Sequence, residues 1–336
     1  MLSNEHYNKI FRSFSNIKVL VIGDVMIDSY IYGKVDRISP EAPVPVVSVQ
    51  KRESRLGGAA NVAMNLKALG AEPIICSVIG NDDKAKQLLD LLEDNNLIIS
   101  GIVKSKNRIT TTKFRIIGNN TQMLRVDEET HEMLSEKDNK LLIKTIHSLI
   151  DTQNIDIIIF EDYDKGLISP ELIDDVVSLA NKLCIPTVVD PKLKNFKEYR
   201  NITLFKPNLK ELKEGLSIVD DLNDINNLQK ALAILHQTQN IQVVLTTLSE
   251  KGVIISFSTV SNKIKFIHIP AHFRSIADVS GAGDTLVSIA ALCLYLKLPP
   301  DQIAIISNLA GGLVCEEVGV VPINKERLLK ELLNLE

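Results

Sequence analysis

Residues 18–24 read Lys-Val-Leu-Val-Ile-Gly-Asp (KVLVIGD), a continuous apolar run that ends in a glycine and an acidic residue. A strand buried on both faces of a parallel sheet has such an unbroken run, whereas a strand with one solvated face alternates. The pattern recurs along the chain, at residues 73–78, 155–160, 187–189, 203–205 and 243–245. We therefore predict a mainly parallel sheet with both of its faces covered.

Stretches with helical periodicity alternate with these runs. They lie at residues 3–14, 59–69, 83–94, 138–149, 170–183, 223–237, 284–296, 300–318 and 325–333. Strands that alternate with helices build right-handed βαβ units, whose helices pack on the two faces of the sheet. The predicted fold class is therefore α/β, with a mainly parallel central sheet flanked by helices.

Two segments interrupt this alternation. Residues 30–49 and 109–125 contain strand-like runs (YIYG, VPVVSV, TTTKFRII, TQMLRV) without a helix of their own. Their alternation of polar and apolar residues is typical of an antiparallel sheet with one face covered and the other in contact with solvent. We predict a small β-strand lid within one domain that spans residues 1–336, because no linker, repeat or low-complexity segment divides the chain.

Composition narrows the class of protein. The 336 residues include 38 Lys+Arg and 42 Asp+Glu, a net charge of −4, and only 4% are aromatic. Proteins that bind nucleic acids are usually basic and stack bases on aromatic side chains, so we expect no nucleic-acid partner. Neither a signal-peptide core nor an apolar run long enough to span a bilayer is found, which predicts a cytoplasmic protein without a membrane partner.

Several common catalytic signatures are missing. The chain has no GxxxxGK[ST] phosphate loop, no GxGxxG after its first apolar run, no HExxH and no GxSxG. Its four cysteines are scattered and form no CxxC pair, which argues against a disulfide framework or a zinc site. P-loop proteins, dehydrogenases, metalloproteases and α/β-hydrolases are therefore disfavoured.

Residues 278–287, DVSGAGDTLV, are the segment most informative about chemistry. Gly281, Ala282 and Gly283 precede an apolar helix, whose first N–H groups form a cradle for an anion such as a transferring phosphoryl group. Asp284, in the first helical turn, can accept a proton from a hydroxyl held against that cradle. The alternative is a plain glycine loop in which Asp284 only caps the helix.

Two segments are candidates for binding a sugar. In LGGAANVA (56–63), Gly57 and Gly58 allow a ligand close to the backbone, and Asn61 offers both a donor and an acceptor. Tight packing of a helix on the sheet is the alternative. Asp28 follows the first strand, and α/β folds bind ligands at the carboxyl ends of their strands, where a carboxylate suits sugar hydroxyls.

Asn208 and Glu211 lie three residues apart at a predicted helix start. Both side chains could face a nucleotide phosphate and the water shell of its Mg²⁺. The same spacing fits a capping box, with Asn as the cap and Glu at the third position. Spacing alone leaves both interpretations open.

Taken together, the segments resemble the ribokinase (PfkB) family of carbohydrate kinases. GGAAN (57–61), DPK (190–192), PNLKE (207–211), TLSEKG (247–252) and DVSGAGDT (278–285) follow the order seen in that family. The resemblance implies a ribokinase-like fold, ATP and Mg²⁺ as cofactors and, in many relatives, a K⁺ ion.

Within the family, GDVMID (23–28), RISPEAPVPV (37–46) and TTK (111–113) resemble the heptose-phosphate kinases of lipopolysaccharide precursor synthesis. This implies that ATP phosphorylates the anomeric (O1) hydroxyl of D-glycero-β-D-manno-heptose 7-phosphate to the 1,7-bisphosphate. The alternatives are another kinase of the family, acting on ribose, fructose or a related sugar, and a non-catalytic nucleotide-binding protein.

Carried over position by position, the resemblance makes Asp284 the catalytic base and the backbone of Gly281, Ala282 and Gly283 an anion hole. Nucleotide-binding roles fall on Lys192, Asn208, Glu211, Thr247, Ser249, Gly252 and Asn308. Sugar-binding roles fall on Asp28, Gly57, Gly58, Asn61 and Asp162. Glu211 would hold Mg²⁺ through water, and Asp278 would belong to a site for a monovalent cation.

A site that binds a sugar phosphate needs cationic side chains to contact the phosphate. Lys113, Arg115 and Arg125 on the predicted lid strands, together with Arg37, are the candidates, and a solvated charged face is the alternative. The sequence departs from the family at Ser280, where Thr is usual, and at Glu161, where Ser commonly precedes Asp-Tyr, which leaves local substrate contacts open.

Two expectations concern assembly. Bifunctional relatives add a nucleotidyltransferase domain, and because the chain contains no HxGH motif we expect the kinase half alone. Exposed strand edges need cover, and lids of this family often pair between subunits, so we expect a homodimer through the lid strands.

Overall fold

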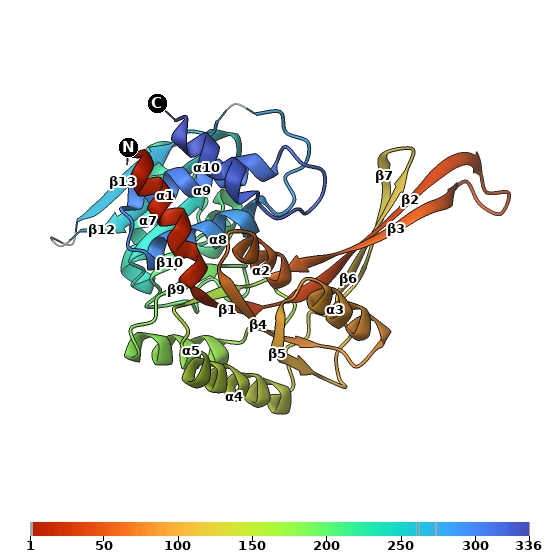
Figure 1. The fold of residues 1–336 in the computed structure, drawn as a ribbon, viewed down its shortest axis with the longest axis horizontal. Helices are drawn as coiled ribbons and strands as arrows, with labels where there is room; N and C mark the ends of the chain where they lie inside the picture. Colours follow the sequence, from red (N-terminus) through yellow and green to blue (C-terminus); the bar gives the residue numbers. More distant parts are fainter. Residues whose placement is uncertain (1–2, 260, 262, 273, 336) are drawn as a thin grey trace.

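In the computed structural model, which describes residues 3–259, 261, 263–272 and 274–335, nine strands form the central sheet (Figure 1). Their order is β13-β12-β11-β10-β9-β8-β1-β4-β5, parallel throughout except at β11–β12 and β12–β13. The strands are β1 (Lys18–Gly23), β4 (Glu72–Ile79), β5 (Ile98–Lys104), β8 (Ile157–Glu161), β9 (Thr187–Asp190), β10 (Leu204–Phe205), β11 (Val243–Thr247), β12 (Val253–Ser258) and β13 (Ile264–Ile269). The prediction of a mainly parallel sheet is confirmed.

Alternate residues of each central strand enter two different hydrophobic cores. Val19 and Val21 of β1 belong to one core, and Leu20 and Ile22 belong to the other. All four side chains are fully buried. An unbroken apolar run is therefore what this position in the sheet requires, because a polar residue at any of the four would be buried.

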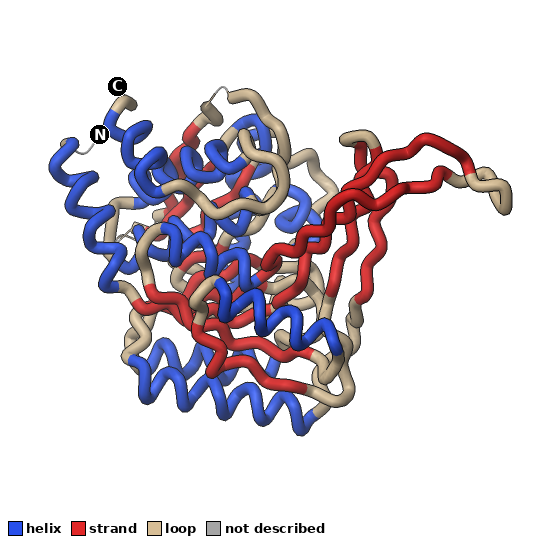
Figure 2. Tube along the Cα trace, turned by 45° about the vertical axis from the view of Figure 1, so that its right-hand side comes forward, coloured by secondary structure: helices blue, strands red, loops and turns tan. Residues whose placement is uncertain are grey.

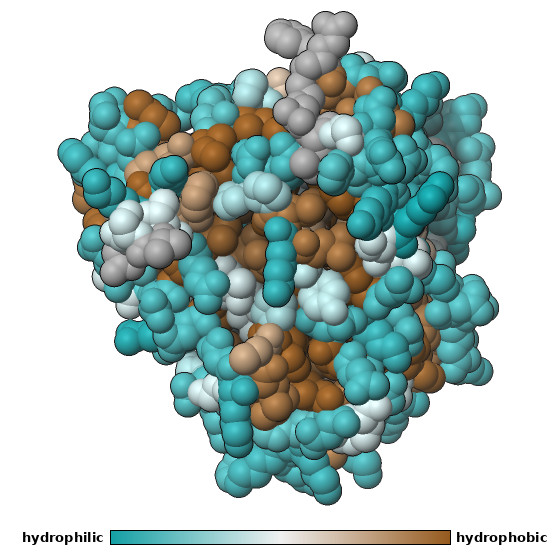
Figure 3. All heavy atoms as spheres, turned by 60° about the vertical axis from the view of Figure 1, so that its left-hand side comes forward, coloured by the Kyte–Doolittle hydropathy of each residue, from teal (hydrophilic) through white to brown (hydrophobic). Residues whose placement is uncertain are grey.

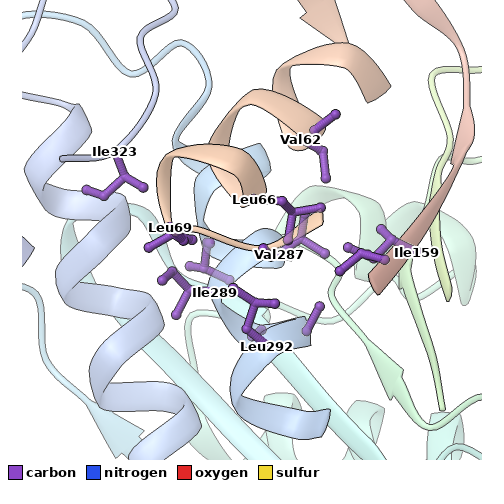
Figure 4. Close-up of a cluster of buried hydrophobic side chains, with 14 of the residues drawn as sticks. Val62, Leu66, Leu69, Ile159, Val287, Ile289, Leu292 and Ile323 are labelled. Carbon is purple, nitrogen blue, oxygen red and sulfur yellow. The ribbon is translucent and has the colours of Figure 1, made fainter. Parts of the chain in front are cut away.

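Helices cover both faces of the sheet. The core around Val19 and Val21 includes side chains from α1, α2, α3, α8, α9 and α10, and the opposite core includes α4, α5 and α7. Figure 4 shows part of the first core, where Leu66 of α2 lies beside Val287 of α8. The helices are α1 (Asn4–Ser13), α2 (Ala59–Ala68), α3 (Asp83–Asp94), α4 (Glu136–Gln153), α5 (Pro170–Lys182), α6 (Leu209–Gly215), α7 (Ile225–Gln239), α8 (Ala282–Tyr295), α9 (Pro300–Val314) and α10 (Lys325–Leu333).

A second sheet of four strands extends outward from the molecule (Figures 1 and 2). It contains β2 (Val25–Ile38), β3 (Pro45–Gly58), β6 (Thr112–Gly118) and β7 (Thr121–Glu128), in the order β3-β2-β6-β7. We call it the lid sheet. Both segments predicted to hold lid strands contribute to it. β2 begins earlier than predicted and β3 and β7 end later, whereas β6 begins at Thr112, after the predicted start at residue 109.

The prediction of a purely antiparallel lid is wrong at one pair. The hairpins β2–β3 and β6–β7 are antiparallel, whereas β2 and β6 pair in parallel. Each hairpin leaves the body through its first strand, so the two first strands run in the same direction where they meet.

Strands β5, β12 and β13 were not predicted, and helix α9 ends at Val314 although a helix was predicted to residue 318. β5 and β13 are the two edges of the central sheet, and half-buried residues interrupt their patterns. Within the described residues, no helix is long and apolar enough to cross a membrane. On the face shown in Figure 3, hydrophilic side chains surround patches of apolar ones.

Candidate active site

A cavity of about 530 Å³ lies where the carboxyl ends of several parallel strands meet the beginning of α8. Parallel strands bring their carboxyl ends to one edge of a sheet, where α/β folds bind ligands. The cavity is lined by Tyr163, Asp190, Lys192, Lys206, Asn208, Leu209, Lys210, Glu211, Thr247, Ser249, Gly283 and Asp284. Seven of these were predicted as site residues: Lys192, Asn208, Glu211, Thr247, Ser249, Gly283 and Asp284.

Asp284 is held from two sides. Its Oδ2 accepts a hydrogen bond of 2.6 Å from Asn61 Nδ2, and its Oδ1 accepts one of 3.0 Å from the Tyr163 hydroxyl. The residue is only 7% exposed. Because each carboxylate oxygen has two lone pairs, both oxygens can still accept a proton or a further hydrogen bond.

The surroundings of Asp284 also make it a better base. Burial raises its pKa to about 6, and the neighbouring Asp190 carboxylate adds to this, against the opposing effects of Asn61, Tyr163 and Lys206. A general base works best when its pKa lies near the working pH, since it is then mostly ionised and still takes a proton readily. The geometry and the raised pKa together suit Asp284 to proton abstraction.

The start of α8 provides donors next to this carboxylate. Gly281 precedes the helix with φ 81°, in the left-handed region, and a Cβ added there would lie 3.1 Å from Asn61 Nδ2. The N–H groups of the first turn, which includes Ala282 and Gly283, have no carbonyl partner inside the helix. The Ala282 N–H donates to the Val279 carbonyl, 3.3 Å away and just before the helix. The turn lies beside a carboxylate that can act as a base, and an anion cradle at this point stays a prediction.

Two lysines bring positive charge to the cavity. Lys206 Nζ lies 2.9 Å from Asp190 Oδ2, and Lys192 Nζ lies 2.6 Å from Glu211 Oε1 and 3.7 Å from Asp190 Oδ1. The Lys192 ammonium also lies over the ring of Tyr163. Cations placed in this way suit the phosphates of a nucleotide.

Tyr163, Asp190 and Lys206 were not singled out as functional residues, although Asp190 belongs to the quoted DPK motif. Each comes at the end of an apolar strand or within two residues of it: β8, β9 and β10. That position is the signal that could have identified them. The other unpredicted lining residues, Leu209 and Lys210, open helix α6.

For Asn208 and Glu211 the structure shows the capping box, and it places both residues at the cavity, while their contact with a nucleotide stays a prediction. They form a complete capping box, in which Asn208 Oδ1 accepts from the Glu211 N–H at 2.8 Å and Glu211 Oε2 accepts from the Asn208 N–H at 2.9 Å. Both also line the cavity. A carboxylate held by a cap and by Lys192 keeps free lone pairs, so Glu211 can still bind the water shell of a Mg²⁺ ion.

Gly252 and Asn308 do not line this cavity, although both were predicted to contact the nucleotide. Gly252 forms the turn after β11, and Asn308 of α9 donates a hydrogen bond of 2.9 Å to the Pro270 carbonyl. Pro270 belongs to a second, mostly apolar cavity of about 450 Å³ that shares Leu209 with the first. That cavity is lined by Leu209, Leu222, Asn223, Ile225, Leu228, Leu248, Glu250, Lys251, His268, Pro270 and Ala271.

The predicted sugar-binding residues lie where the lid sheet joins the body. Gly57 approaches Asp28 so closely that an added Cβ would come within 2.4 Å of Asp28 Oδ2. Gly58 begins α2, the helix that carries Asn61. Asp28 is 3% exposed and forms an ion pair with Arg115 on the neighbouring strand.

Lys113 and Arg125, two of the other candidate cations, already have acidic partners. Lys113 lies 3.5 Å from Asp127 and 3.2 Å from Glu129, and Arg125 lies 3.0 Å from Asp127. Arg125 is the more exposed of the two, with 54% of its side chain accessible.

Two predicted acidic residues are occupied by the fold itself. The prediction that Asp162 binds sugar finds no support, because its carboxylate accepts hydrogen bonds from buried Asn195 and Tyr199 and it does not line the cavity. Asp278 accepts from the backbone N–H groups of Ser280 and Gly319, at 2.9 and 3.0 Å. It therefore joins the loop before the cradle to the loop after α9.

Comparison with known proteins agrees with this geometry. The model of the pfkB family of carbohydrate kinases matches residues 16–327. The chain belongs to that family. It is 36% identical to the bifunctional protein HldE of Caulobacter sp. (strain K31), over 96% of this chain and 64% of that protein. It is 39% identical to HldE of Aliarcobacter butzleri, over 90% of this chain and 61% of that protein. The chain thus spans less than two thirds of the length of these relatives.

Solved structures share the fold. Phosphofructokinase-2 from Escherichia coli in complex with potassium superposes with a TM-score of 0.76 at 19% identity, covering 95% of this chain and 99% of that one. Arabidopsis thaliana ribokinase complexed with ribose and ATP gives a TM-score of 0.70 at 17% identity, covering 94% and 99%. The predicted ribokinase-like fold is confirmed, and the prediction of an ATP-dependent phosphotransferase is confirmed at the level of the family.

We expect Asp284→Asn to lower kcat by about 10²-fold or more, because the amide keeps the shape of the carboxylate but cannot take the proton. Nucleotide binding should persist, since the cradle and the lysines are unchanged. Steady-state kinetics and an ATP-binding titration on the same preparation measure both quantities. A near-normal kcat in this variant would remove Asp284 from the chemistry.

Proposed function

We propose that the chain is a kinase of the sugar phosphate D-glycero-β-D-manno-heptose 7-phosphate, which acts in the cytoplasm on the anomeric hydroxyl with ATP. Its product would be the 1,7-bisphosphate, a precursor of ADP-heptose and the lipopolysaccharide core. The segments GDVMID, RISPEAPVPV and TTK support this substrate within the carbohydrate kinase family. The observation that carries it is a row of cations on one face of the lid sheet.

That face is identified by strand register. Residues paired across neighbouring strands point to the same side of a sheet. Asp28 pairs with Arg55 on β3 and with Lys113 on β6, and the next outward row on the same face pairs Arg115 with Arg125. The same register puts Asp127 opposite Lys113 and Glu53 opposite Tyr30, so these two rows of the face combine four cations with three carboxylates, among them Asp28 for sugar hydroxyls.

The pair of arginines argues for an anionic ligand. Like charges directly opposite each other destabilise a sheet, and Arg115 and Arg125 occupy such a position on β6 and β7. Asp28 and Asp127 already offset part of this repulsion by pairing with Arg115 and Arg125. A phosphate bound between the two guanidinium groups would offset more of it, and each group can donate two parallel hydrogen bonds to it. An unphosphorylated sugar would leave this pair without a ligand.

The mechanism follows from the geometry around Asp284. Asn61 and Tyr163 orient the carboxylate, which accepts the proton of the anomeric hydroxyl as its oxygen bonds to the γ-phosphorus. The bond from that phosphorus to the bridging oxygen of ATP breaks in the same transfer, and ADP leaves. The N–H groups at the start of α8 and the nearby lysines stabilise the charge on the phosphoryl oxygens. Glu211 with Asn208 would hold the Mg²⁺ of the nucleotide through water, and the ion would supply neutralisation of phosphate charge. A K⁺ ion near Asp278 remains a prediction of the family resemblance.

The nucleotide would extend across both cavities. Its phosphates suit the polar cavity with Lys192 and Lys206, and its adenine suits the mostly apolar one that contains Leu248 and Pro270. Asn308, bound to the Pro270 carbonyl, would then lie at the adenine end. ATP would thus place its terminal phosphate toward Asp284.

The substrate assignment is tested with ATP, Mg²⁺ and a panel of heptose 7-phosphate, the unphosphorylated heptose, ribose and fructose. We expect rapid formation of a bisphosphate from the heptose 7-phosphate. Mass spectrometry detects the bisphosphate, and phosphorus NMR distinguishes a phosphate on the anomeric oxygen. Rapid turnover of ribose or fructose with no bisphosphate would support another sugar kinase of the family instead. No turnover of any sugar, with ATP still bound, would support a non-catalytic protein.

The arginine pair gives a second expectation. Arg125→Gln should raise KM for heptose 7-phosphate by about 10-fold or more, the loss expected for a hydrogen bond between charged groups, with little change in kcat. Lys34→Gln, an exposed cation on β2 that pairs with Asp36, is the matched control. An equal effect of Arg125→Gln on the heptose with and without its phosphate would contradict a phosphate role.

The opposite face of the lid sheet supports a homodimer. It carries the apolar side chains of Phe114, Ile116, Leu124 and Val126. Because the sheet projects into solvent, Leu124 is 54% exposed. A second copy of this chain would cover these apolar side chains by a two-fold contact between lid sheets.

We expect sedimentation equilibrium to give a mass near twice 37.3 kDa. Leu124→Asp should shift the mass toward that of the monomer, because it places a charge in the apolar contact. Val219→Asp, at an exposed site away from the lid sheet, should leave the mass unchanged. A wild-type mass of a single chain would exclude the dimer.

A further inference from the structure

Glu161, the last residue of β8, is a buried carboxylate that the mechanism above does not use. It is 1% exposed, and neither of its carboxylate oxygens has a hydrogen-bond partner among the described residues. An ionised carboxylate without a donor is one of the costliest groups to bury. At this position the chain also departs from the serine common in the family, so the carboxylate is a feature of this sequence.

Two other carboxylates lie next to it. β8 is the neighbour of β9 in the sheet, and Glu161 pairs in register with Asp190, so both side chains leave the same face. Asp284 reaches the same point from α8. One oxygen of each residue lies within 4.8 Å of one oxygen of each of the other two.

The charges around this cluster do not balance. Lys206 and Lys192 both approach Asp190, at 2.9 and 3.7 Å, and neither forms an ion pair with Glu161. Lys192 is also held by Glu211 at 2.6 Å, so four acidic side chains share two ammonium groups. Burial, with the nearby Asp190 and Asp284, raises the pKa of Glu161 well above its usual range, so a bound cation would take the place of a proton there. Asp190 Oδ1, like both oxygens of Glu161, accepts no hydrogen bond within the described part of the chain.

A hard divalent cation matches this arrangement. Mg²⁺ binds oxygen at roughly 2.0–2.1 Å and Ca²⁺ at roughly 2.3–2.6 Å, so ligand oxygens on opposite sides of such an ion lie about 4–5 Å apart. We propose that Glu161, Asp190 and Asp284 form a divalent-cation site, for Mg²⁺ or Mn²⁺, distinct from the position that Glu211 would hold with the nucleotide.

The role of this ion in catalysis rests on the proposed function, because the ion would act in the phosphoryl transfer. Asp190 and Asp284 line the polar cavity, so an ion bound to them borders the space for the transferring phosphate. Such an ion would offset the negative charge of the cluster and attract a phosphoryl oxygen. Asp284 retains a lone pair on each oxygen beside Asn61 and Tyr163, so it can bind the ion through one oxygen and accept a proton on the other. The ion would lower the pKa of Asp284 from the value that burial gives it.

The test is binding of Mn²⁺ without nucleotide, measured by electron paramagnetic resonance on the full 336-residue chain. The wild type should bind one Mn²⁺ that Mg²⁺ displaces. Glu161→Gln, which keeps the size of the side chain, should weaken this binding by 10-fold or more. Glu211→Gln is the matched control, because an amide at that position can still accept from the Asn208 N–H and should leave this ion in place.

Circular dichroism checks that each variant is folded, and a second variant at the same position provides a further control. Glu161→Ser, with the residue common in the family, should fold and also lose the ion. Binding by the wild type that survives in both variants, or no binding by the wild type at all, would overturn the proposal. The sugar panel is a separate measurement. If heptose 7-phosphate is turned over but no Mn²⁺ binds in the absence of nucleotide, only the ion site is rejected. If Mn²⁺ binds but heptose 7-phosphate is not turned over, only the substrate is rejected.

Discussion

The hydrogen bond from Asn61 to Asp284 joins helices α2 and α8 in the interior of the molecule. Both side chains are buried, so breaking the bond would leave a buried carboxylate short of a donor. One turn further along α2, Asn65 Oδ1 accepts from the Thr285 hydroxyl and from the Ile323 N–H, each at 3.0 Å. Because α2 begins where strand β3 ends, this helix pair positions both the base and the root of the lid sheet.

Electrostatics restrict the site as strongly as packing does. The chain carries a net charge of −4, and both ligands of the proposed sugar-phosphate kinase would be anions. Attraction must therefore come from local cations, which the fold supplies at the ends of β9 and β10 and on the lid sheet. Burial, with the neighbouring Asp190 carboxylate, raises the pKa of Asp284, and the grouping of Glu161, Asp190 and Asp284 concentrates acidic side chains in the same region.

The parts of the fold that the sequence predicted well are those buried on both sides. β1 and β8 are unbroken apolar runs because two cores demand it, and such runs stand out in a single sequence. β5 and β13 are edge strands with half-buried residues, and the β12–β13 hairpin follows a polar turn, so their patterns resemble those of loops. The lid strands were recognised by alternation, but their register and the parallel β2–β6 pair depend on how two hairpins meet.

The sequence by itself determined the motifs that end strands or begin helices: Asp284 in its glycine-rich turn, and Asn208 with Glu211 at a helix start. The chemistry of these residues can be predicted from the local sequence, because a few neighbouring residues determine the backbone conformation around them. Only the tertiary structure decided that Tyr163 and Asn61 hold Asp284, that Glu161 lies beside Asp190, and that Asp162 is turned into the core. These contacts depend on strand order, register and helix packing, which join residues distant in the chain and leave no pattern in the local sequence.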